Sequence, residues 1–239
     1  MLMKSLLVSI LVGLLFSASA LVQAQQRTER SLGDFDKVVV SDKIDLVLTE
    51  GDQNTIRLDY VQASDQDIIT RVTGKKLRIY LAGCRFGCDD PRLVNTRVVA
   101  YLTYKTLKKL IVMGENEVIN RSDINAPRFV LRAMGDSDIS LNSITADRWK
   151  IALYGDSQLS VEDGEVGMIK IKSFGDNDLF LDKVSSRTSK VHVFGDSQLN
   201  LQVQDEMSLT IFGDATVYNQ GNPWVSHRWV FGELTFESL

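Results

Sequence analysis

The sequence predicts an all-β protein, a single-stranded parallel β-helix with rungs of about 20 residues. The first reason is a repeat in which an apolar residue precedes a glycine and an acid follows it. The second is the alternation of apolar and polar residues around each glycine, as in "KIKSFGDNDLFL", which is typical of strands. The third is the near-constant spacing of the glycines at 21, 20, 20, 20, 18 and 19 residues; they are Gly114, Gly135, Gly155, Gly175, Gly195, Gly213 and Gly232. A unit of this length cannot bury a core alone, so the copies must stack.

The first element in the chain is a predicted secretory signal peptide, residues 1–24. Lys4 precedes an apolar run from Leu6 to Phe16, and small residues follow it. We expect cleavage after Ala24, with Ala20 as the alternative; no cysteine follows either site, so a lipid anchor is not indicated. We therefore expect export to the periplasm, the outer-membrane surface or the medium. No later stretch has about 18 uninterrupted apolar residues, so no membrane span is expected in the mature form.

The charge of the mature chain argues against nucleic acid as a partner. Residues 1–24 contain one lysine and no acid, so their removal changes the net charge from −4 to −5. A mildly acidic exported protein lacks the positive field that draws a protein to a polyanionic backbone without sequence preference.

Residues 25–239 are predicted to form one β-helix domain, in which residues 32–112 make less regular first rungs. Strand patterns occur in "FDKVVVSDKIDLVLTEGDQNTIRLDY", "KKLRIYL" and "TRVVAYLTY". The open end of the solenoid needs a cover, and we expect either this irregular half or the C-terminal "WVFGELTFESL" to provide it.

A cysteine loop, residues 82–96, is expected to protrude from this first half. It holds the only two cysteines, Cys84 and Cys88, in "GCRFGCDDP". In an oxidising compartment a short-loop disulfide is the first interpretation, with free thiols or an intermolecular bond as the alternative. A metal site would need two more ligands, and the only histidines, His192 and His227, are far away in the sequence.

Residues 113–239 form the regular repeats, in which each glycine is expected to bend the chain between two strands. Glycine reaches positive φ at little cost, and an acid beside it can hydrogen-bond nearby backbone. In a parallel solenoid these acids stack about 4.8 Å apart in a column. We favour a turn-capping role for them; calcium binding is the alternative, and the metal ligands stay undetermined. The column contains Glu115, Asp136, Asp156, Asp176, Asp196, Asp214 and Glu233.

A second column, which precedes the glycines, is mainly aromatic. Strict alternation would place its side chains outside, but we expect the bend to rotate them into the corner of the core. If they face outward instead, an apolar strip of this length is a candidate docking surface for a glycan or protein, or a homo-oligomer interface. The members are Met113, Met134, Tyr154, Phe174, Phe194, Phe212 and Phe231.

A third column is basic and is most simply a solvated strand face. Binding of an anionic polysaccharide is the alternative. The column contains Lys109, Lys150, Lys170 and Lys190, with Arg132, Lys172 and His192 two residues closer to the glycines.

The chain resembles the family called putative auto-transporter adhesin, head GIN domain. The resemblance begins at "FDKVVVSDKIDLVLTEGD" and continues through "LTYKTLKKLIVMGENEV" into the glycine repeats, so it covers about residues 32–239. It implies a right-handed parallel β-helix that bacteria export, with a function largely unassigned. The turns differ, because this chain has an aromatic before the glycine and Asp after it, where the family typically has Ser-Gly-Ala-Ser-Asp.

No enzyme activity is predicted. Catalysis needs one unique constellation, whereas the acids and lysines here repeat in columns, and the common catalytic and phosphate-binding motifs are absent.

The predicted function is that of an adhesin-like protein of the cell envelope, which recognises a glycan or protein through its repetitive surface. No cofactor is expected, with calcium as the exception noted above. The alternative is a structural or self-associating envelope protein, and a polysaccharide-active enzyme ranks third. The candidate binding residues are Tyr154, Phe174, Phe194, Phe212, Asp136, Asp156, Asp176, Asp196 and Asp214.

Overall fold

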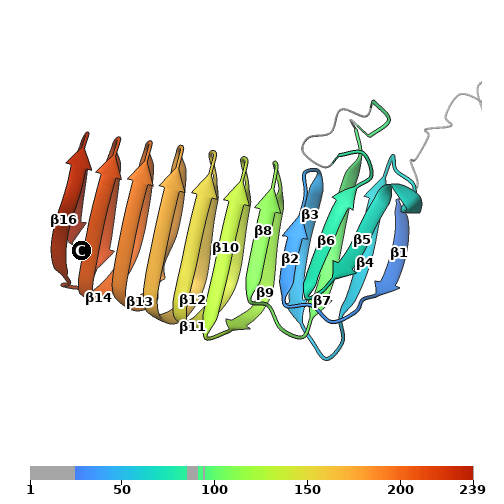
Figure 1. Ribbon diagram of the computed structural model, residues 1–239, viewed down its shortest axis with the longest axis horizontal. Helices are drawn as coiled ribbons and strands as arrows, with labels where there is room; N and C mark the ends of the chain where they lie inside the picture. Colours follow the sequence, from blue (N-terminus) through green and yellow to red (C-terminus); the bar gives the residue numbers. More distant parts are fainter. Residues whose placement is uncertain (1–24, 85–90, 94, 239) are drawn as a thin grey trace, which may run out of the picture.

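The computed structural model describes residues 25–84, 91–93 and 95–238. Its strands join into one 17-stranded sheet that winds into a solenoid (Figure 1), and a continuous apolar core fills the interior. The fold is therefore the predicted all-β solenoid with rungs of about 20 residues. The predicted signal peptide, residues 1–24, lies outside the described residues, and so does Cys88.

The regular half is a stack of parallel rungs, each running from one turn glycine to the next. Long strands start just after one glycine, bend midway and end just before the next, so each one contributes to both faces of the solenoid. Equivalent residues of neighbouring rungs pair directly, as Phe174 does with Phe194. The strands are β8 (Lys109–Met113), β9 (Glu117–Asn125), β10 (Arg128–Met134), β11 (Asp138–Tyr154), β12 (Gln158–Phe174), β13 (Asn177–Phe194), β14 (Ser197–Phe212), β15 (Ala215–Gln220), β16 (Trp224–Phe231) and β17 (Leu234–Ser238).

The turn glycines are required by both backbone conformation and space. All seven have positive φ, between 101° and 125°. A Cβ added to Gly175 would lie 2.4 Å from the carbonyl oxygen of Gly155 in the rung below. Any other residue would therefore be strained and would also push neighbouring turns apart.

The N-terminal half also contains rungs, but their order in space differs from their order in the chain. It includes β2 (Lys37–Val40), β3 (Ile44–Glu50), β6 (Lys76–Leu81) and β7 (Arg97–Tyr104). Blue β2 lies between green β8 and teal β6 in Figure 1, and it pairs with both in parallel. The rung of β6 and β7 therefore lies outside the rung of β2 and β3, although it comes later in the sequence.

Antiparallel strands cover the N-terminal end of the stack, whereas we expected this part of the chain to form less regular rungs. β4 (Thr55–Val61) pairs antiparallel with β7, β1 (Gln26–Ser31) pairs antiparallel with β4, and β5 (Ile68–Thr73) pairs antiparallel with β6. A period-two pattern does not distinguish parallel from antiparallel pairing, which explains the difference. Of the two alternatives that we considered for the cover, the irregular half is the one that provides it.

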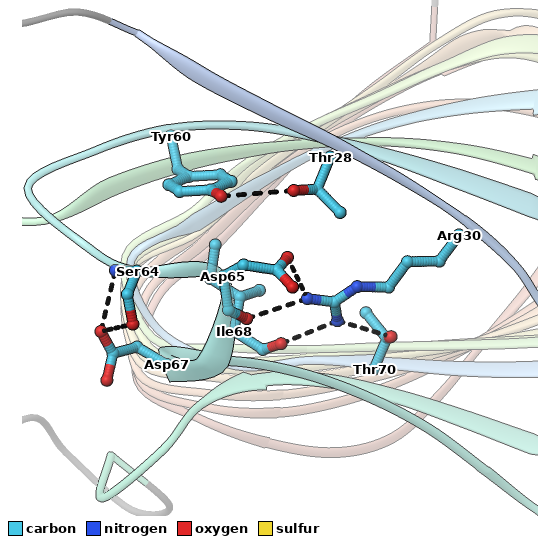
Figure 2. A network of polar contacts seen from close by, with 8 residues as sticks. All are labelled: Thr28, Arg30, Tyr60, Ser64, Asp65, Asp67, Ile68 and Thr70. Carbon is cyan, nitrogen blue, oxygen red and sulfur yellow. Dashed lines mark hydrogen bonds and ion pairs between the residues drawn. The ribbon is translucent and has the colours of Figure 1, made fainter.

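Arg30 on β1 links the covering strands to the segment that leads into β5 through hydrogen bonds (Figure 2). Its guanidinium donates hydrogen bonds to the carbonyl oxygen of Ile68 at 2.8 Å, to Oγ1 of Thr70 at 2.9 Å and to the carbonyl oxygen of Asp65 at 2.9 Å. Asp65 also forms an ion pair with it, at the start of the short 3₁₀ helix η1 (Asp65–Asp67). One side chain therefore joins β1, η1 and β5.

The C-terminal segment continues the solenoid as its last rung and leaves that end open. Trp224, Trp229 and Phe231 on β16 are 68%, 62% and 57% exposed. The two ends of the molecule therefore differ, because one carries covering strands and the other exposes large apolar side chains.

Candidate binding face

One face of the solenoid carries three outward rows of side chains that follow the strand register. This face, here called the basic face, comprises β6, β2, β8, β10, β16 and the C-terminal halves of β11, β12, β13 and β14. Because paired residues in parallel strands lie about 4.8 Å apart, each row is a periodic line of side chains.

The first row, here called the aromatic row, lies beside the turn glycines and faces outward. Tyr154, Phe194 and Phe212 are 41%, 37% and 38% exposed. Our expectation that the bend rotates these rings inward is wrong. The positive φ of the glycine takes up the bend, so the residue before it keeps the strand alternation. The row runs Met113, Met134, Tyr154, Phe174, Phe194, Phe212 and Phe231.

Small polar side chains occupy the interior corner where we expected the rings. Ser137, Ser157 and Asn177 follow the acids of the turns and are buried. The hydroxyl of Ser157 donates to the carbonyl oxygen of Gly135 at 2.8 Å, and its backbone N–H donates to Oδ1 of Asn177 at 3.0 Å. Sequence reasoning missed this ladder, although the recurring Ser or Asn after Gly-Asp signals it.

The rings of the aromatic row stack on one another and present their edges to solvent. The centroids of successive rings from Tyr154 to Phe231 are 5.0, 4.7, 5.1 and 5.2 Å apart, and the planes are tilted by 2–14°. Ring faces are therefore occupied by neighbouring rings. The outward edges carry the positive part of the aromatic quadrupole, so this apolar strip is compatible with anions.

The second row, here called the lysine row, is a line of ammonium groups. Lys37 pairs with Lys76 on one side and with Lys109 on the other. After an interruption at Val130, the row continues through Lys150, Lys170 and Lys190. Like charges at this spacing repel, by about 1 kcal/mol per pair in water at 4 Å.

The third row, here called the middle row, lies between the other two and adds more positive charge. It runs Arg78, Val39, Ile111, Arg132, Ala152, Lys172, His192 and Thr210. None of the members of the three rows is acidic. The face is therefore positive, although the whole chain has a net charge of −4.

At its N-terminal end the basic face is hollowed into a groove of about 790 Å³. Six of its thirteen lining residues are basic and none is acidic; the basic ones are Lys37, Arg71, Lys75, Lys76, Arg78 and Lys109. Burial, followed by the charges of Arg132, Lys37 and Lys76, lowers the pKa of Lys109. Sequence reasoning missed the groove because most of these residues come from the part of the chain without a regular period.

The predicted acidic column lies along the turns, where its carboxylates accept backbone hydrogen bonds. Oδ1 of Asp136 accepts from the N–H of Asp156, and Oδ1 of Asp156 accepts from the N–H of Asp176, both at 3.3 Å. Asp196 and Asp214 accept in the same way from the next acid in the column. These acids therefore cap the turn of the following rung rather than their own. Within the described ranges, no group of three or more His, Cys, Asp or Glu side chains is placed to hold a metal ion.

The sequence profile of the family described as putative auto-transporter adhesin, head GIN domain, matches residues 34–223. The chain belongs to this family. The family is described as one of adhesins rather than of enzymes, and that description implies export. A search of curated proteins finds no match.

Several solved structures share this fold at low sequence identity. A putative adhesin from Bacteroides fragilis has a TM-score of 0.78 at 12% identity, over 91% of this chain and 98% of that one. A putative adhesin from Parabacteroides merdae has a TM-score of 0.71 at 14% identity, over 91% and 97%. A protein from Parabacteroides distasonis described as a putative lipid binding protein has a TM-score of 0.66 at 14% identity, over 91% and 98%.

Two further expectations concern the cysteines and the membrane. Cys84 is buried, but its predicted partner Cys88 lies outside the described residues, so the disulfide stays a prediction. In the part of the chain that the structure describes, no helix combines the length and apolar composition needed to cross a membrane.

Proposed function

We propose that this GIN domain protein is an exported, adhesin-like protein of the cell envelope that binds an extended anionic glycan along its basic face. The observation that carries the proposal is the lysine row in constant register, with the aromatic row parallel to it and no acid in the three rows. A repeating line of charge complements a polymer with repeating carboxylate or sulfate groups, and such complementarity mainly gives specificity and fast association.

The lysine and middle rows would contact the charges of the glycan, and the aromatic row would contact its apolar parts. Because the ring faces are occupied by neighbouring rings, sugars would pack against the ring edges rather than stack on ring faces. The acidic column would lie beyond the aromatic row and confine the ligand to the basic side. This arrangement favours an acidic polymer over a neutral one.

Binding should be measured by calorimetry with alginate, heparin and neutral dextran at two salt concentrations. We expect the acidic polymers to bind, more weakly at high salt, and dextran not to bind. The triple variant Lys150→Gln, Lys170→Gln and Lys190→Gln should lose about tenfold in affinity, since exposed charge pairs contribute about 0.2–1 kcal/mol each. A matched triple variant outside the three rows, Lys105→Gln, Arg121→Gln and Arg187→Gln, should bind normally. Equal binding of dextran, or equal losses in both variants, would refute the proposal.

Self-association through the aromatic row is the second candidate, and the geometry of the rings favours it. Stacked ring edges form a flat apolar strip that extends from Tyr154 to Phe231, and such strips often mark protein contacts. Analytical ultracentrifugation would test it with Tyr154→Ser and Phe194→Ser. A concentration-dependent dimer that these substitutions abolish supports self-association, whereas a monomer at all concentrations excludes it.

A further inference from the structure

We propose that the groove at the N-terminal end of the basic face is a separate site for a sugar phosphate monoester. The inference deepens the proposed function, since such a sugar could be the charged end of the same glycan. It rests on three properties of the groove: the register of the strands that line it, its positive charge and its volume. A groove of about 790 Å³ has the volume of a small-molecule site and is too large for one inorganic anion alone.

The strand register forces like charges together in the groove. Lys37 lies between Lys76 and Lys109, and Arg71 on β5 lies directly opposite Arg78 on β6. Like charges at directly opposed positions destabilise a sheet. The chain has more acids than bases, 31 against 27, yet no acid lines the groove. A bound anion would offset this repulsion.

Among the described residues, the cations of the groove have little negative charge near them to neutralise them. Lys37 lies 3.9 Å from Oδ1 of Asp36, which is a long ion pair. No other lining cation forms an ion pair with a described residue. The lowered pKa of Lys109 agrees with this picture, because burial and its basic neighbours disfavour its charged form. An anion in the groove would counteract the effect of the basic neighbours on the pKa of Lys109.

The type and number of these cations favour a phosphate monoester over a carboxylate. Two adjacent guanidinium groups can donate several hydrogen bonds to a tetrahedral oxyanion, and the lysines add point charges. A phosphate monoester carries about −1.5 to −2 charges at pH 7, more than a carboxylate or a sulfate ester. It therefore neutralises more of the cluster.

The floor of the groove suits a sugar attached to the phosphate. Val39, Ile111, Met113 and Met134 provide an apolar surface, and Tyr80 adds a ring with a hydroxyl group. Ligand sites commonly combine such surfaces with a few charged groups that fix the orientation. The phosphate would contact the cations while the sugar ring packs against the floor.

The test uses titration calorimetry of the protein with glucose 6-phosphate, glucose 6-sulfate, glucuronate and glucose. We expect glucose 6-phosphate to bind at least tenfold more tightly than each of the others. The double variant Lys76→Gln and Arg78→Gln should weaken this binding at least twentyfold. The same variant should also melt about 2 °C or more above the parent, since it removes like-charge repulsion from the groove. The matched variant Lys105→Gln and Arg121→Gln should change neither quantity.

Each outcome separates this inference from the proposed function. Binding of glucose 6-phosphate that survives in the groove variant overturns the inference, as does equal binding of the sulfate ester or of glucose. If alginate and heparin bind but glucose 6-phosphate does not, the groove inference fails and the proposed function stands. If glucose 6-phosphate binds and is lost in the groove variant while no acidic polymer binds, the groove inference stands and the proposed function fails.

Discussion

The turn glycine and the acid that follows it perform two different tasks in each rung. The glycine adopts a positive φ where the carbonyl of the rung below leaves no room for a Cβ. The acid places Oδ1 over the backbone N–H of the next acid, as Asp136 does for Asp156. Repulsion along the column is thus offset by a backbone hydrogen bond at four of its six steps, and a column of carboxylates needs no cation to explain it.

Two glycine substitutions separate the cost of backbone strain from the cost of a steric clash with the neighbouring rung. Gly175→Ala should destabilise the protein by about 2–5 kcal/mol, because it adds backbone strain and a clash with the carbonyl of Gly155. The control Gly74→Ala also has positive φ, at 60°, but no atom lies within 4 Å of its added Cβ. The free energy of unfolding of this control should fall by only about 1–2 kcal/mol. Urea unfolding of both variants measures the difference, and equal losses would show that the stacked carbonyl is not decisive.

At the scale of elements, the covering strands depend on buried or partly buried ion pairs. Asp59 on β4 is 4% exposed, and Nε of Arg27 on β1 donates to its Oδ1 at 2.8 Å. This hydrogen bond is the main cause that lowers the pKa of Asp59, and the charges of Arg27 and Arg57 add to it, against the effect of burial. Arg30 lowers the pKa of Asp65 in the same way. The cover is therefore the acid-sensitive part of the fold.

Acid should loosen this cover first. Because the folded-state pKa of Asp59 lies below its unfolded value of 3.8, its contribution is complete above pH 3.8 and is lost as the pH falls through the folded value. Asp59→Asn should lower the free energy of unfolding by about 1–2 kcal/mol at pH 7. The difference in this free energy between the variant and the parent should become smaller below pH 3.8. Urea midpoints from pH 2.5 to 7 measure this. The exposed control Asp52→Asn should change the free energy of unfolding at pH 7 by less than about 0.5 kcal/mol. A constant difference between Asp59→Asn and the parent across this pH range would contradict the assignment.

At the scale of the whole molecule, the two ends of the solenoid have unequal support. Each rung is stabilised mainly by its neighbours, as in other repeat proteins. The N-terminal rungs are covered by β1, β4 and β5, whereas β16 and β17 have neighbours on one side only. Trp224 and Trp229 add large exposed apolar surfaces at this open end.

Hydrogen exchange should therefore follow position along the stack. We expect the fastest exchange in β16 and β17, slower exchange in β14, and the slowest in β12 and β13, because opening propagates inward from an unsupported end. Exchange measured by mass spectrometry at low and high protein concentration checks this. Uniform protection at low concentration would contradict the prediction. Protection of β16 that appears only at high concentration would show that the open end is covered by association.

The repeat made much of the fold predictable from the sequence. The period, the strand alternation and the turn role of the glycines are confirmed, because each follows from local backbone preferences. The order of the N-terminal rungs was not predictable. Alternation is the same in parallel and antiparallel strands, and it does not indicate that β2 lies between β6 and β8.

The candidate face was predictable only in part. The lysine and aromatic columns were identified from spacing, but the orientation of the rings was wrong because we expected the bend to begin before the glycine. Strict alternation gives the correct orientation for Phe174, whose neighbour Ser173 is buried. Arg71 and Arg78 face each other across the short hairpin of β5 and β6, but the groove also depends on Lys37, Lys76 and Lys109, which meet only through long-range pairing. No local pattern could have brought them together.

The constant register has a consequence for how such a chain can change over generations. An in-frame duplication of one complete rung, such as residues 156–175, would insert a strand that pairs with its own copy and keeps every column aligned. Loss of a rung by unequal recombination would be equally well tolerated. The number of rungs sets the length of the basic face. Selection can therefore lengthen or shorten this face by whole rungs while both ends of the molecule stay the same.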